Sequence, residues 1–140
     1  MIIDGTNLVL GRLASFASKK ALDGEDVVIL NCENVVVSGR KVFLLELYKS
    51  KHERGHPFHG PFFPKMADRI VKRAVRGMLP YKQQRGVIAF KKIQCFLGVP
   101  IAYQNKKFDK VSIPDASKFN TLNYLRLNDV SKHLGSKQVQ

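Results

Sequence analysis

The sequence is poor in cysteine and in acidic residues, and it has no long hydrophobic run. No apolar stretch approaches the roughly 18 residues that a membrane-spanning helix requires. An early acid, Asp4, and the lack of a cationic start before the first apolar residues argue against a signal peptide. Two cysteines, Cys32 and Cys95, are too few for a disulfide scaffold. We therefore expect a cytoplasmic protein with no membrane partner.

The shortage of acids leaves a large positive charge, because 24 Lys and Arg outnumber 11 Asp and Glu and give a net charge of +13. Such a chain is typical of proteins that bind a polyanion. The charge is uneven: residues 65–92 carry nine cations and one acid, whereas residues 1–34 carry three cations and five acids. This distribution predicts a binding surface in 65–92 and a scaffold in the N-terminal third.

The hydrophobic pattern predicts an α/β core over residues 1–100, which includes the basic helix region 65–92. A helix at 11–22 lies between an apolar start and a β-branched run at 26–31, and a short strand follows at 35–38. This order is typical of a parallel sheet. The pattern further predicts helices at 39–51, 65–79 and 87–92 and a strand at 93–97. Residues 101–140 are predicted to form a basic extension, with one short helix at 129–134 capped by Asn128.

A zinc-protease motif, H-E-x-x-H, occurs as HERGH at residues 52–56. Zinc binding by this motif requires both histidines on one continuous helix, with the glutamate as general base. Gly55 weakens a helix, and Pro57 disfavours helical geometry at the residue before it. We therefore interpret 52–64 as a loop without a metal. A zinc hydrolase that uses both histidines and the glutamate stays open as an alternative function.

Other catalytic signatures are weak. The glycines at positions 5 and 11 flank a strand-to-helix connection, but their spacing and Leu13 in place of Ser or Thr exclude a phosphate-binding P-loop. Arg12 is still placed to reach an anion at the helix start. Neither cysteine has a local catalytic partner, and no serine elbow occurs. We expect no enzyme activity, no cofactor and no small-molecule substrate.

The basic segment 65–92 carries the strongest functional signal. Its first helix places apolar residues at 3- and 4-residue steps and cations at the complementary positions. Asp68 is its one acid, so phosphate contact explains the surplus of cations better than solvation does. The preceding loop adds three phenylalanines expected to be exposed and able to stack on nucleotides, namely Phe58, Phe62 and Phe63.

No RRM, KH or zinc-knuckle signature accompanies this charge. The pattern therefore favours recognition of nucleic-acid shape and backbone over a short base sequence. A general DNA- or RNA-binding regulator is the second alternative function.

The string VRGMLPYKQQRG at residues 75–86 resembles the signature of the universal large-subunit ribosomal protein thirteen family in its archaeal and eukaryotic form. The segments IIDGTNLVLGRLAS, LNCENVVVSG, ERGHPFHGPFFP and FLGVPIAY are similar to other parts of that family. The likeness covers about residues 1–103 and, more weakly, the stretch NYLRLNDVSKHLG in the tail.

The resemblance implies a three-layer α/β/α fold with a four-stranded parallel sheet. It also implies a structural role in the ribosome, in which the protein binds large-subunit rRNA beside neighbouring ribosomal proteins and supports subunit assembly. No enzymatic activity is implied.

The resemblance places the RNA-facing surface on the 54–64 loop, on the basic helix and on the turn at 79–85. Together with the charge pattern it predicts the following RNA-binding residues: Arg12, Arg40, Lys41, Arg54, His56, His59, Lys65, Arg69, Lys72, Arg73, Arg76, Lys82, Arg85, Lys91 and Lys92. No catalytic and no metal-binding residue is predicted.

Overall fold

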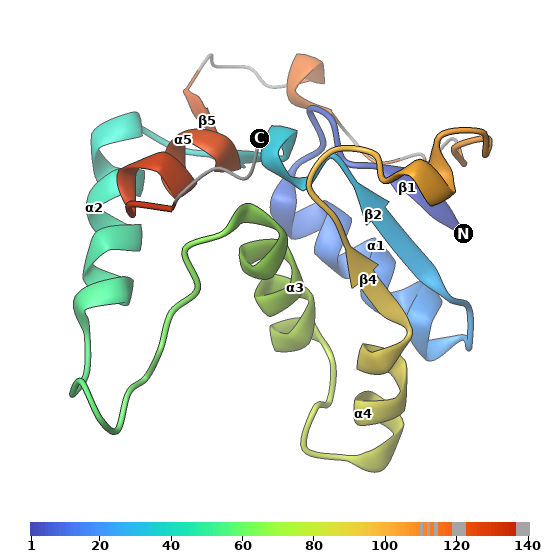
Figure 1. Ribbon diagram of the computed structural model, residues 1–140, viewed down its shortest axis with the longest axis horizontal. Coiled ribbons are helices and arrows are strands. Elements are labelled where there is room, and N and C mark those ends of the chain that lie inside the picture. Colours follow the sequence, from blue (N-terminus) through green and yellow to red (C-terminus); the bar gives the residue numbers. More distant parts are fainter. Residues whose placement is uncertain (110, 112, 114, 119–122, 137–140) are drawn as a thin grey trace.

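Three parallel strands form the central sheet of the computed structural model, which describes residues 1–109, 111, 113, 115–118 and 123–136 (Figure 1). The strands are β1 (Ile2–Asp4), β2 (Val27–Leu30) and β4 (Ile93–Cys95), in the order β1-β2-β4. Ile3 lies opposite Ile29 of β2, and Ile29 lies opposite Cys95 of β4. The parallel α/β architecture is confirmed, but the predicted four-stranded sheet is wrong, because three strands form it in the described part of the chain.

The strand expected to be the fourth, β3 (Val36–Ser38), leaves this sheet. After β2 the chain turns sharply, because Asn31 adopts the left-handed conformation with φ 53° and a short 3-10 helix, Cys32–Asn34, follows. β3 then makes one parallel bridge, from Val36 to Val9, and otherwise pairs antiparallel with β5 (Tyr124–Arg126). β5 lies in the C-terminal extension, where the sequence pattern predicts no strand.

The described residues form five α-helices around the two sheets: α1 (Leu10–Leu22), α2 (Lys41–Glu53), α3 (Ala67–Met78), α4 (Gln84–Lys91) and α5 (Leu127–His133). Most of their bounds differ from the predicted ones by one to three residues, and the end of α1 at Leu22 agrees with the prediction. α5 begins two residues early, with Arg126 rather than Asn128 at its N-terminal boundary. Figure 1 shows α2 and α5 side by side, so the C-terminal helix packs on the helix that precedes the HERGH loop.

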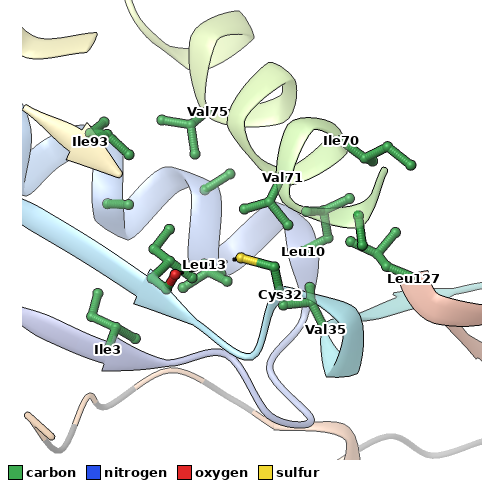
Figure 2. Close-up of a cluster of buried hydrophobic side chains, with 14 of the residues drawn as sticks. Ile3, Leu10, Leu13, Cys32, Val35, Ile70, Val71, Val75, Ile93 and Leu127 are labelled. Atoms are coloured by element: carbon green, nitrogen blue, oxygen red, sulfur yellow. Dashed lines mark hydrogen bonds between the residues drawn. The ribbon is translucent and has the colours of Figure 1, made fainter. Parts of the chain in front are cut away.

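The hydrophobic core lies where α1 and α3 pack against each other and against one face of the three-stranded sheet. Figure 2 shows Val71 and Val75 of α3 directed toward α1 and the sheet, with Val75 near Ile93, and the side chains of Leu13, Val71 and Val75 are fully buried. Strand alternation places Ile3 and Ile93 on the same face. The other face is more exposed at the centre of the sheet, and the second helical layer that the three-layer prediction puts there stays a prediction.

We expect Leu13→Ala to lower the free energy of unfolding by roughly 2–5 kcal/mol, because it removes a fully buried side chain and leaves a cavity between α1 and α3. Equilibrium unfolding in urea measures the change. The control is Val42→Ala on α2, whose side chain is 68% exposed and whose loss should cost less than about 0.5 kcal/mol. Similar losses for the two variants would contradict this placement of the core.

Candidate nucleic-acid interface

α3 carries the central cations of the predicted interface and anchors them to the core. Ile70, Val71 and Val75 are buried, whereas Arg69 and Arg76 are exposed on the other side of the helix. The helical period separates these two faces, so burial of the apolar stripe fixes the direction of the cationic one. Two further cations of this helix, at positions 72 and 73, are half-buried.

Three of these cations lie over aromatic rings that come from three different segments. The distances from the cationic atom to the ring centre are 4.9 Å for Arg73 over Phe63, 5.3 Å for Lys72 over Phe90 and 5.5 Å for Arg76 over Tyr81. A cation within about 6 Å of a ring is attracted by its quadrupole, by roughly 0.5–1 kcal/mol at an exposed site. The rings therefore restrict side chains that would otherwise move freely in solvent.

Arg73 also ties the loop before α3 to the helix. Its Nη1 donates a hydrogen bond to the carbonyl oxygen of Phe62 at 2.8 Å. The next ring, Phe63, packs edge-to-face on Tyr48 of α2 with 5.8 Å between ring centres. Arg73 thus connects the loop, and through it α2, to the cationic face of α3.

The cations of α3 surround an open depression of about 200 Å³. Its lining consists of Pro64, Arg69, Lys72, Arg73, Arg76 and Phe90. Neither of the two ion pairs found in the described residues, Lys20 with Glu25 and Lys49 with Glu53, includes any of these cations. Guanidinium groups arranged in this way suit the oxygens of a phosphate, which they can bind through two parallel hydrogen bonds.

The HERGH segment does not form one helix. α2 ends at Glu53, and Gly55 has a positive φ of 109°. The chain then closes a tight turn in which His56 and Gly60 exchange two backbone hydrogen bonds of 3.1 and 2.8 Å. The prediction that no continuous helix carries both histidines is therefore confirmed, although the loop begins at residue 54 and not at 52. The described residues contain no group of three or more His, Cys, Asp or Glu placed to hold a metal ion.

The tip of this loop displays aromatic rings to solvent. Phe58 and Phe62 are 84% and 68% exposed, as predicted. The ring of His56 lies 5.7 Å from that of Phe58 and 5.4 Å from that of His59, measured between centres. The sequence predicts an exposed Phe63 as well, but the packing of this ring on α2 leaves it half-buried.

The turn between α3 and α4 is held tightly against the start of α4. Leu79 is buried, and Gln83 donates a backbone hydrogen bond to the carbonyl oxygen of Pro80 at 2.9 Å. Gly86 lies so close to that same carbonyl that a Cβ on it would overlap the Pro80 backbone. This close approach sets the position of Tyr81, the ring over which Arg76 lies.

The remaining predicted residues lie on other elements. Arg12 is exposed on the first turn of α1, and the exposed pair Arg40 and Lys41 stands at the start of α2. The exposed side chains of Arg54, Lys65, Lys82, Arg85 and Lys91 lie in the segments that flank α3 or in α4. Lys92 donates a hydrogen bond to the carbonyl oxygen of Gly24 at 2.5 Å, which gives this cation a role in holding α4 to the loop after α1.

Three rings of the site are not predicted from the sequence as partners of the cations. Tyr81 and Phe90 lie in segments predicted as a basic turn and a short helix, and Phe63 is predicted to be an exposed ring. Their meeting with particular cations depends on how α4 and the loop pack on α3, and no local sequence signal reports such packing. Pro64, which completes the depression, escapes prediction for the same reason.

Cys32 is not placed to act as a nucleophile. A hydrogen bond with Cys95 and burial raise the pKa of the Cys32 thiol far above its usual range. The reactive thiolate is therefore scarce at neutral pH. Cys32 instead points into the core, where its Sγ lies 3.6 Å from the carbonyl oxygen of Ile29 (Figure 2).

Comparison with known proteins gives consistent matches. The model of the family described as Ribosomal protein L13 matches residues 1–102. The chain is 43% identical to the large ribosomal subunit protein uL13 of Methanococcoides burtonii over 136 residues, which cover 97% of this chain and 98% of that one. It is 41% identical to the protein of the same name from Archaeoglobus fulgidus, over 99% of this chain and 89% of that one. For the protein of that name from Methanosarcina barkeri the identity is 40%, over 97% and 98%.

We expect opposite effects from alanine at two helical glycines. Gly86→Ala should lower the free energy of unfolding by about 1–3 kcal/mol, because the new methyl group meets the Pro80 carbonyl. The new methyl group of Gly77→Ala on α3 meets nothing within 4 Å. This variant should raise the free energy of unfolding by about 0.5–1 kcal/mol, because alanine lowers the flexibility of the unfolded chain. Urea unfolding of both variants measures the contrast, and equal signs would contradict the tight turn.

We also expect no stoichiometric zinc on the HERGH segment, because His52 is the last-turn residue of a helix that ends before His56. Protein treated with a chelator and then given zinc should release the metal on desalting, as measured by elemental analysis. His56→Ala should leave that result unchanged. Tightly held zinc that disappears in the variant would restore the hydrolase alternative.

Proposed function

Because this chain belongs to the ribosomal protein L13 family, we propose that it is a structural constituent of the large ribosomal subunit that binds rRNA and supports subunit assembly. The named relatives are large ribosomal subunit proteins that match it over nearly their whole length, and their source organisms are archaea. The protein therefore acts in the cytoplasm as part of the ribosome, and catalysis has no place in this function.

The observation that carries the proposed RNA contact is the cluster of oriented cations on α3. Arg73 and Arg76 each lie over a ring, so less side-chain freedom is lost when a phosphate binds. Phosphate contacts of this kind supply most of the affinity of a basic protein for RNA and make it sensitive to salt. The cluster would thus fix the protein on the rRNA backbone.

Two flanking segments extend the proposed interface. The loop tip offers the exposed rings of Phe58 and Phe62, which suit stacking on unpaired bases. The turn after α3 offers the exposed cation Lys82, and the first turn of α4 offers Arg85. Since both segments join directly to α3, the three surfaces can contact one RNA molecule together.

The other predicted contacts form a second part of the proposal. Arg12, Arg40 and Lys41 are exposed at the starts of α1 and α2, and we propose that they contact rRNA or the acidic surfaces of neighbouring large-subunit proteins. A zinc hydrolase is not favoured, because α2 stops inside its motif. A free nucleic-acid-binding regulator would bind RNA without staying on purified large subunits in high salt, whereas we expect this protein to co-sediment with them.

We expect Arg76→Glu to weaken binding to large-subunit rRNA roughly tenfold or more, because it replaces a charged hydrogen bond to phosphate with repulsion. The salt dependence should become shallower by about 0.7–0.9 log units per log salt for each phosphate that the variant no longer neutralises. Filter binding across a salt titration measures both.

Lys132→Glu on α5 is the matched control, because it makes the same change in net charge at an exposed helix position outside the predicted set. Both variants should unfold at nearly the wild-type urea concentration. Equal weakening by the two would mean that total charge, and not the α3 cluster, determines binding.

A further inference from the structure

The depression on α3 contains more than a phosphate site needs. Phosphate binding requires donors and positive charge, and Arg69, Lys72, Arg73 and Arg76 supply these at the rim. The lining also includes two apolar rings, the phenyl ring of Phe90 and the pyrrolidine of Pro64. These surfaces gain nothing from a phosphate, but they suit a planar ring.

The size of the depression suits a small planar group. Its volume of about 200 Å³ is below the roughly 300–1,000 Å³ of sites for drug-sized ligands. It suits a single nucleobase, with the attached phosphates outside among the cations. In a paired A-form helix the bases are stacked, and side chains cannot enter the narrow major groove. Only a nucleotide that has left the stack can fill such a depression.

We propose that this depression receives one unstacked nucleotide of the rRNA, with its base against Phe90 and Pro64 and its flanking phosphates on the arginines of α3. The inference rests on the proposed rRNA-binding function and adds a second kind of recognition to it. A bulge or loop would be distinguished from a regular duplex, because only the former presents such a base.

The position of Lys72 fits this arrangement. In the free protein its Nζ lies 5.3 Å from the centre of the Phe90 ring, so the ring already attracts a cation. The lysine side chain is flexible and its ammonium is a point charge without directional demands. A base that stacks on Phe90 can displace this ammonium toward the phosphate that arrives with the base.

Probing of the rRNA in complex with the full-length protein tests the proposal. Dimethyl sulfate and a 2′-hydroxyl acylating reagent report unpaired nucleotides, and hydroxyl radicals report the backbone. We expect wild-type protein to protect the base of one unpaired nucleotide inside its backbone footprint. Phe90→Leu keeps an apolar side chain without a π-face, so it should restore the reactivity of that base and keep the footprint. The loss of affinity should be roughly 5- to 140-fold, the range of one stacked base.

Two control variants separate stacking from packing. Phe96→Leu removes a half-buried ring that packs on Tyr103 and lies outside the depression, and it should leave the protected base protected. Phe90→Tyr keeps the aromatic face and should also keep the protection. If Phe90→Tyr exposes the base as fully as Phe90→Leu does, the ring acts through packing and the proposal is overturned.

Failure of the nucleotide site and failure of the proposed function give different footprints. If wild-type protein leaves no backbone footprint on large-subunit rRNA, the proposed function itself fails. If the footprint is present and no base changes reactivity in Phe90→Leu, the function stands and the nucleotide site is overturned. Thermal unfolding of each variant in the same buffer confirms that only folded protein is compared.

Discussion

The structure depends on α3, which buries apolar side chains in the core on one side and holds four cations close together on the other. Its side chains at positions 70, 71 and 75 are buried, and burial of an aliphatic side chain contributes roughly 1.5–3 kcal/mol. Four cations around one depression repel each other, by about 1 kcal/mol per pair at 4 Å in water and less in salt. Burial of the apolar side of α3 in the core opposes this repulsion, which salt screens further. Among the described residues, neither ion pair includes a cation of the depression.

The rings beneath the cations change what this charge can do. A long cation in solvent samples many rotamers, and ordering one on binding costs about 0.5–1.5 kcal/mol. Phe63 and Tyr81 come from the loop and the turn, so two segments converge on one helix to limit that motion. Such an arrangement favours a partner with a fixed spacing of phosphates, as in folded RNA, over a flexible acidic chain.

Local sequence patterns predicted the elements of this fold well and their tertiary partners poorly. The β-α-β start and the amphipathic α3 follow from periodicity, because each buries a stripe that sequence displays directly. The fate of β3 does not, since it depends on the left-handed Asn31 and on pairing with β5 almost ninety residues later. Periodicity also predicts the cations of α3. The rings of Tyr81 and Phe90 over which two of them lie depend on tertiary packing and are not predicted.

Two glycines explain how the rings of Phe63 and Tyr81 reach their places. At Gly55 the backbone passes so close to the Gly60 carbonyl that no side chain fits, and at Gly86 the same is true of the Pro80 carbonyl. The first contact closes the loop that leads to Phe63, and the second closes the turn that bears Tyr81. Gly55 follows the end of α2 at Glu53, inside the zinc-protease motif. The glycine at which this helix does not continue therefore also shapes the loop beside the cations.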